Sequence, residues 1–251
     1  MSGDDDAIVL PNAFLGFVEA MRELTVDGMP DLAIIGGVGV NIRLATSAEV
    51  HRATLDVDVV ADHRVPGVVE ILVGDGAPAL GDTVVVRGVS VDVIVTEPVT
   101  DHDLSGLDDS QYLFLSGHRF ALDTSRAVRI TAVDSALTAR IAVATPAGLI
   151  AAKCHALGYP TTTRRATKHG GDLWDVFRLI EVFDRQGSIR DELSEAPGQL
   201  GRLIADVIER EMLTRPQQAA HQMGLASLGE APSIEQLADV LQPFLEELRA
   251  R

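Results

Sequence analysis

Short apolar runs dominate the first part of the chain, and their spacing predicts a region rich in β-strands. The run 32–35 ends at two glycines and is typical of a buried strand that enters a tight turn. Residues 52–60 alternate polar and apolar side chains, as a half-buried strand does. The β-branched runs 83–86 and 89–95 predict a hairpin that turns at Arg87-Gly88. The same region also contains predicted helices over 12–25, 38–45 and 66–73 and weaker predicted strands over 128–133 and 140–144.

The apolar spacing becomes helical at Thr145-Pro146. Threonine is a favourable N-cap and proline suits the first helical position, so we expect a helix from here through Leu157, ended by Gly158. A polar loop is expected to follow over 159–171. Three further helices are predicted over 172–184, 199–213 and 233–250, the last opened by a capping box of Ser233 and Gln236.

Together these elements predict an α+β protein with two domains. Residues 1–140 would form a mixed β-sheet flanked by helices, and residues 141–251 a C-terminal helical domain. A chain of 251 residues is long enough for such a division, because each part can bury a core of its own.

Composition favours a cytoplasmic protein with no membrane partner. The hydrophobic fraction is 46% and the mean hydropathy +0.17, yet no apolar run approaches the roughly 20 residues of a membrane helix. The first residues, Met1 to Asp6, are acidic and therefore unlike a secretory signal. The single cysteine, Cys154, excludes an intramolecular disulfide and lies in an apolar stretch, where an inert packing thiol is expected.

The charge balance limits the partners that the chain can have. Its 21 basic and 37 acidic residues give a net charge of −16, which argues against an extensive non-specific contact with nucleic acid. A local basic cluster still lies in the predicted polar loop, formed by Arg164, Arg165, Lys168 and His169. The histidines show no spacing typical of a zinc site.

Candidate chemistry begins with two aspartates in the predicted strand 52–60. Asp56 and Asp58 project to the same face because strand side chains alternate. Adjacent carboxylates repel each other unless a positive charge lies between them, and a divalent cation would supply it. Asp92 is a third isolated carboxylate, in the second strand of the predicted hairpin. A solvated edge strand is the alternative interpretation of the aspartate pair.

These residue types fit phosphoryl or nucleotidyl transfer. Such reactions need neutralisation of phosphate charge, which two divalent ions about 3.5–4 Å apart often provide. Mg²⁺ prefers oxygen ligands, so the three aspartates together with nucleotide phosphates would suffice. The turn at Gly36-Gly37 would let backbone amides approach a phosphate.

With these residues in place, the chain resembles a known family. Gly36-Gly37, the series Arg52-x-Thr54-x-Asp56-x-Asp58 and the later Asp92 look like the minimal nucleotidyltransferase fold of the DNA polymerase β superfamily. The helical half adds Lys153-Cys154-His155-Ala156-Leu157 and Asp172-Leu173-Trp174-Asp175, which resemble the lysine and the DxxD helix of the AbiEii nucleotidyltransferase toxins, including the mycobacterial MenT group. The resemblance covers roughly residues 30 to 185. It departs at the turn, which is more often Gly-Ser in the superfamily.

The resemblance implies roles for particular residues. Asp56, Asp58 and Asp92 would hold Mg²⁺, with two ions expected, and Gly36 and Gly37 would bind the nucleotide phosphates. In the helical half, Lys153 would contact the triphosphate and Asp175 would be its acidic partner. Such proteins move a nucleotide from a nucleoside triphosphate to an acceptor, a tRNA 3′ end where this is known, and a cognate antitoxin restrains them.

Other candidate residues have structural alternatives. Arg52 and Thr54 could orient the carboxylates or phosphates, or simply lie at the surface. The cluster at Arg164, Arg165 and Lys168 could hold an acceptor's phosphates, or be a solvated loop. Two alternatives concern the helical half: Lys153 could extend along apolar surface to reach water, and Asp172 and Asp175 could lie in the first turn of a helix, where the dipole favours them, with Asp172 as the N-cap.

Two other functions stay open at this point. A small-molecule adenylyltransferase of the antibiotic-resistance type would keep the chemistry and change the acceptor, and the net charge of −16 suits a cationic aminoglycoside. A non-catalytic nucleotide-binding module on the same fold is the other.

Overall fold

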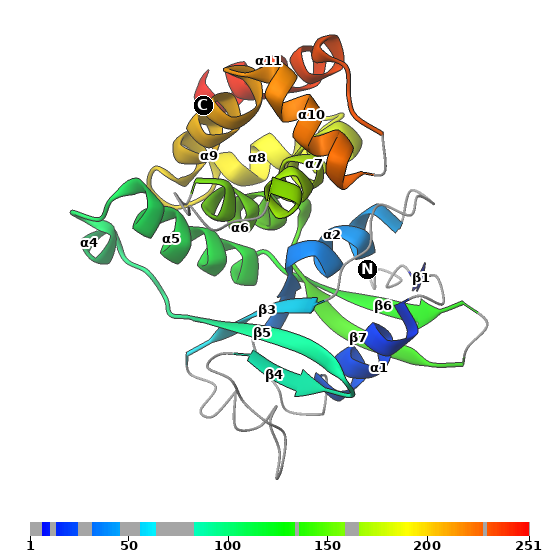
Figure 1. Cartoon of the computed structure of the whole chain (residues 1–251). Coiled ribbons are helices and arrows are strands. Elements are labelled where there is room, and N and C mark those ends of the chain that lie inside the picture. The colour runs from blue at the N-terminus through cyan, green and yellow to red at the C-terminus, as the bar shows by residue number, and fades with distance from the viewer. Residues whose placement is uncertain are drawn as a thin grey trace. The chain divides into compact units, whose positions relative to one another are not determined.

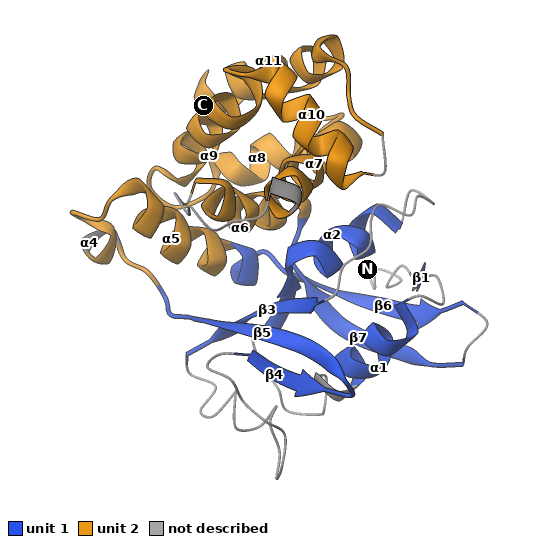
Figure 2. Ribbon diagram, in the orientation of Figure 1, with its two compact units in different colours: residues 1–98, 121–145 blue, residues 99–120, 146–251 orange. Residues whose placement is uncertain are grey.

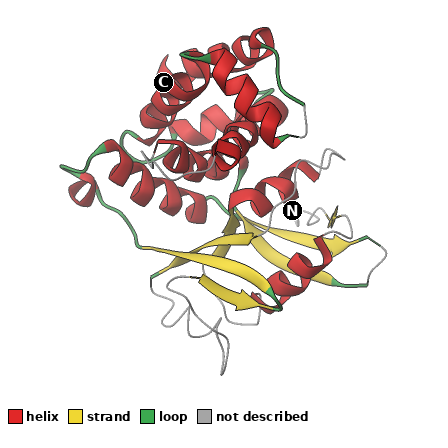
Figure 3. Ribbon diagram, viewed as in Figure 1, coloured by secondary structure: helices red, strands yellow, loops and turns green. Residues whose placement is uncertain are grey.

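The computed structural model describes the residues 7–10, 14–24, 32–45, 56–63, 83–133, 136–158, 166–227 and 230–250. These residues divide into two compact units, each formed from two segments of the chain (Figure 2). Unit 1 comprises residues 1–98 and 121–145, and unit 2 comprises residues 99–120 and 146–251. All described strands belong to unit 1 (Figure 3).

Unit 1 is built on a mixed seven-stranded sheet, in the order β1-β6-β7-β2-β3-β5-β4 (Figure 1). Parallel pairs join β1 to β6, β7 to β2 and β3 to β5, and the other neighbours are antiparallel. The α+β class predicted from the sequence is therefore confirmed. The strands are β1 (Ala7–Leu10), β2 (Leu32–Ile35), β3 (Asp56–Asp62), β4 (Thr83–Val86), β5 (Val89–Thr96), β6 (Arg126–Ala132) and β7 (Thr138–Val143).

The core of unit 1 lies against one face of this sheet. Val57 and Val59 of β3 belong to the same buried cluster as Val18 and Met21 of helix α1 (Leu15–Leu24). Asp56 and Asp58 of β3 alternate with these valines and are only half-buried, so they occupy the opposite face. Helix α2 (Gly36–Ala45) begins where β2 ends.

Unit 2 is a packed set of helices. Its largest fully buried side chains include Phe177, Phe244 and Leu149, each from a different helix. A close approach joins two of the helices at Gly170, where an added Cβ would lie 2.1 Å from the backbone oxygen of Gln222. The helical segments are α4 (Asp101–Leu104), α5 (Asp109–Asp123), α6 (Pro146–Gly158), α7 (Ala166–Phe183), α8 (Ser188–Ser194), α9 (Leu200–Ile208), the π-helix Glu209–Leu213, α10 (Pro216–Ala226) and α11 (Ile234–Ala250), with the end of α5 assigned to unit 1.

Several predicted elements are confirmed. Strand 32–35 and the hairpin at Arg87-Gly88 are present, with β5 one residue longer than expected. The capping box is formed, because Gln236 N donates to Ser233 Oγ and Ser233 N donates to the Gln236 side chain. Helix α6 begins at Pro146 and ends at Gly158. The predicted helix over 66–73 lies outside the described residues.

Other predictions need correction. The polar loop expected over 159–171 is wrong from 166 onward, because α7 already begins at Ala166. Asp172 is therefore inside α7 and is not an N-cap. The region 1–140 was predicted to form one domain, a mixed sheet flanked by helices, but most of its helix α5 belongs to unit 2. None of the described helices combines the length and the apolar character needed to cross a membrane.

Candidate functional site

Two of the three predicted aspartates lie directly opposite each other. β3 and β5 pair in parallel, and the register places Asp58 beside Asp92 and Asp56 beside Ser90. Residues paired in this way project from the same face of a sheet. All three aspartates are half-buried, whereas Val57, Val91 and Val93 beside them are buried. The sheet therefore gathers the three carboxylates on its face opposite α1.

Gly36 brings the backbone close to this group. It has a φ of +63° and stands where β2 passes into α2. A Cβ built on Gly36 would lie 1.8 Å from Oδ2 of Asp58, so no other residue type fits without a shift. The N-terminus of α2 and the Asp58 carboxylate are thus neighbours. The turn predicted at Gly36-Gly37 is not a separate element, because α2 begins at Gly36 directly after β2 rather than at Val38.

Thr83 of β4 is a site residue that the sequence analysis did not identify. Its hydroxyl donates a 2.6 Å hydrogen bond to Oδ1 of Asp92. The two residues are cross-strand partners, with Thr83 opposite Asp92 in the hairpin. The sequence could have predicted this contact. A two-residue turn at Arg87-Gly88 places Val86 opposite Val89 and therefore residue 83 opposite residue 92. One carboxylate oxygen of Asp92 is oriented in this way.

The donor set fits a magnesium ion. Asp58 and Asp92 offer the oxygen ligands that Mg²⁺ prefers, and this ion is usually held by one or two carboxylates together with waters and phosphates. Within the described ranges, no three His, Cys, Asp or Glu side chains are grouped closely enough to hold a metal ion. The cage of three carboxylates that includes Asp56 therefore stays a prediction.

In unit 2, Lys153 is held by two aspartates. Its Nζ lies 2.6 Å from Oδ1 of Asp172 and 2.8 Å from Oδ2 of Asp175. The exposed fractions of these three residues are 7%, 3% and 0%, so the whole cluster is buried between α6 and α7. The alternative that Lys153 extends to water is wrong. The association of Lys153 with Asp175 agrees with the expectation, and Asp172 is a second partner that the sequence analysis placed at a helix cap.

Of the other predicted site residues, the structure describes Lys168. Lys168 is exposed on the first turns of α7. Arg52, Thr54, Arg164 and Arg165 lie outside the described residues. A separate expectation concerns the cysteine: Cys154 is fully buried in α6, and burial raises the pKa of its thiol well above the usual range, as expected for a packing residue.

No protein-family model matches the chain, and no curated protein sequence is significantly similar to it.

Proposed function

We propose that this protein is a Mg²⁺-dependent nucleotidyltransferase with the minimal nucleotidyltransferase fold. It moves a nucleoside monophosphate from a nucleoside triphosphate to an acceptor, a tRNA 3′ end, as the toxin of an AbiEii-like toxin–antitoxin pair. The observation that carries the proposal is the pairing of Asp58 with Asp92 on adjacent parallel strands, beside the left-handed Gly36. The mixed sheet followed by helices also agrees with it.

Each residue of the site has a part in this proposal. Asp56, Asp58 and Asp92 would hold Mg²⁺, which when bound neutralises phosphate charge and promotes loss of pyrophosphate. Asp92 would also accept the proton of the acceptor hydroxyl, with Thr83 orienting its carboxylate. The first amides of α2, which follow Gly36, would donate to the triphosphate. The resemblance also implies a contact of Lys153 with the triphosphate, but Lys153 is buried and held by Asp172 and Asp175, so the proposal gives it no part in binding.

One observation favours an acceptor other than tRNA. A net charge of −16 disfavours a bulky polyanion and favours a cationic small molecule such as an aminoglycoside. An antibiotic adenylyltransferase is therefore the second candidate. It shares the metal site and differs only in the group that is modified.

The experiment is a transfer assay with labelled nucleoside triphosphates and Mg²⁺, first with total tRNA and then with an aminoglycoside. We expect label on tRNA and its loss by roughly a hundredfold or more in Asp58→Asn, as when one electrostatic group of an active site is removed. Asp239→Asn is the matched control, because Asp239 is exposed on α11 of unit 2. Full activity in Asp58→Asn contradicts the proposal. Nucleotide binding without transfer to either acceptor would point to a non-catalytic module.

A further inference from the structure

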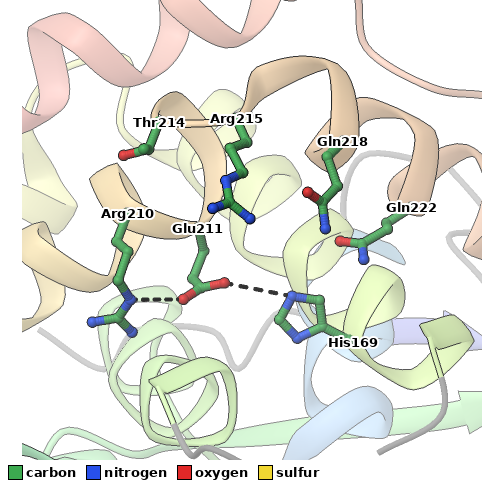
Figure 4. A pocket seen from close by; sticks show the side chains of 7 residues that line it. All are labelled: His169, Arg210, Glu211, Thr214, Arg215, Gln218 and Gln222. Atoms are coloured by element: carbon green, nitrogen blue, oxygen red, sulfur yellow. Dashed lines mark hydrogen bonds and ion pairs between the residues drawn. The ribbon is translucent and has the colours of Figure 1, made fainter.

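A polar cavity of about 290 Å³ opens at the surface of unit 2 and is lined entirely by residues of that unit, whereas the aspartates of the sheet belong to unit 1. Its walls come from α7, from the π-helix Glu209–Leu213, from the two residues after it and from α10 (Figure 4). A volume near 300 Å³ is at the lower end of the range for small-molecule sites. The cavity therefore suits a small polar ligand or the polar end of a larger one.

The local backbone explains why side chains converge here. Thr214 N donates to Glu209 O over 2.9 Å, a bond across five residues that widens the helical turn. Such π-turns redirect side chains and are frequent at functional sites. Pro216 then starts α10 with Arg215 before it, so Arg210 and Arg215 come to line the same cavity.

The cations in this cavity outnumber the anions. Glu211 is shared, because its Oε1 accepts from Arg210 Nε at 2.8 Å and its Oε2 lies 3.6 Å from His169 Nε2. Arg215 has no such neighbour: across the described part of the chain, its guanidinium has no hydrogen-bond or ion-pair partner. One positive charge is thus uncompensated, in a chain whose net charge is −16.

Two side-chain amides complete the lining. Figure 4 shows Gln218 and Gln222 on one side of α10, directed toward His169. Neither amide has a hydrogen-bond partner among the described residues. The two amides therefore offer donors and acceptors for hydroxyl groups, next to the guanidinium of Arg215.

We propose that this cavity binds a phosphorylated small molecule. Arg215 and Arg210 would contact the phosphate, since guanidinium groups form paired hydrogen bonds with phosphate oxygens. Gln218 and Gln222 would contact the hydroxyl groups of the attached sugar. This site is a second one, distinct from the proposed nucleotidyltransferase site, and does not depend on it.

The test is titration calorimetry on the full chain in EDTA, which suppresses any Mg²⁺-dependent binding at the aspartates. The probes are inorganic phosphate, ribose 5-phosphate and AMP, so that a free phosphate, a sugar phosphate and a nucleotide are distinguished. We expect saturable binding of ribose 5-phosphate, weakened about tenfold or more in Arg215→Gln, because charge-assisted hydrogen bonds are lost. Arg185→Gln, at an exposed arginine elsewhere in unit 2, should bind within about twofold of the original.

A second variant tests whether removal of a negative charge from the cavity strengthens the binding of a phosphate. Glu211→Gln removes the carboxylate that opposes an anion in the cavity, so we expect ribose 5-phosphate to bind severalfold more tightly. A variant that merely damaged the fold would not bind more tightly. Unchanged affinity in Arg215→Gln, weaker binding in Glu211→Gln, or no saturable binding of any of the three probes would overturn the proposal.

Discussion

At the scale of single residues, the candidate site depends on a glycine as much as on its acids. Gly36 adopts a left-handed conformation and lies against the Asp58 carboxylate, so it meets two separate constraints. A side chain there would pay the conformational cost of positive φ and would also displace Asp58. The close contact of Gly36 with Asp58 cannot be recognised from the aspartates in the sequence.

We therefore expect Gly36→Ala to be more damaging than its backbone strain explains. The left-handed conformation costs an alanine about 1–2 kcal/mol, and overpacking adds about 1–3 kcal/mol. Gly88→Ala is the matched control, because Gly88 also has a positive φ but nothing lies within 4 Å of its added Cβ. Urea unfolding of both variants measures the difference. Equal losses in the two would show that Asp58 moves aside at no cost, which would contradict the rigid contact described here.

At the scale of elements, the sequence predicted strands better than their partners. The alternation at Asp56–Val59 of β3 and the hairpin of β4 and β5 are local patterns, and both are confirmed. The parallel pairing of β3 with β5 is not local, because it joins strands separated by a long stretch of chain. Periodicity shows which face of a strand is apolar but not which strand lies beside it. The sequence analysis grouped Asp92 with Asp58 because three carboxylates suit a metal site and because of the family resemblance, and no local pattern showed that their strands pair.

Two of the helices also depend on contacts that the local sequence pattern does not predict. Helix α5 and the start of α7 were not predicted, because α5 contains several polar residues and the first turn of α7 is Ala166-Thr167-Lys168-His169. Tertiary contacts decide whether such segments form helices. The buried cluster of Lys153, Asp172 and Asp175 is one of these contacts in α7, and it joins two helices through charges rather than apolar packing.

Removal of Lys153 should therefore destabilise unit 2. In Lys153→Met, two buried carboxylates lose their cation, and breaking a buried ion pair typically costs about 3–5 kcal/mol. Lys168→Met is the control, since Lys168 is an exposed lysine on α7 and its replacement should change stability by less than about 0.5 kcal/mol. Chemical denaturation monitored by the fluorescence of Trp174, which lies beside Asp175, provides the measurement. A Lys153→Met protein as stable as the Lys168→Met protein would mean that the cluster does not hold the helices together.

At the scale of the whole molecule, the chain passes between the two units three times. Residues 99–120 leave unit 1 for unit 2, and residues 121–145 return to complete the sheet. The sequence analysis placed a single boundary after residue 140, a few residues before the apolar spacing becomes helical at Thr145-Pro146. A change of periodicity marks where helices begin, but it does not reveal that an earlier segment packs with them. Tyr112 illustrates this packing, because its hydroxyl accepts a hydrogen bond from the backbone of Gln199 in the same unit.

The two boundaries make different predictions for fragments of the chain. A fragment 1–140 ends inside β7, which lies between β6 and β2 in the sheet. It loses the pairing of Val143 with Ile34 and the carbonyls of Val143 and Ala144 that accept from Arg43. We expect this fragment to lack a cooperative unfolding transition, because the unpaired backbone of the remaining strands costs free energy.

A fragment 1–145 is the matched comparison, because five further residues restore all of β7. Both fragments carry residues 99–120 without the rest of unit 2, so that defect is common to them and cancels in the comparison. We expect 1–145 to show greater protection of β2 and β3 amides in hydrogen exchange than 1–140, since only the longer fragment can form the centre of the sheet. Equal protection in the two fragments would contradict this account. The sheet that presents Asp58 and Asp92 would then not need the strand that crosses the boundary predicted from the sequence.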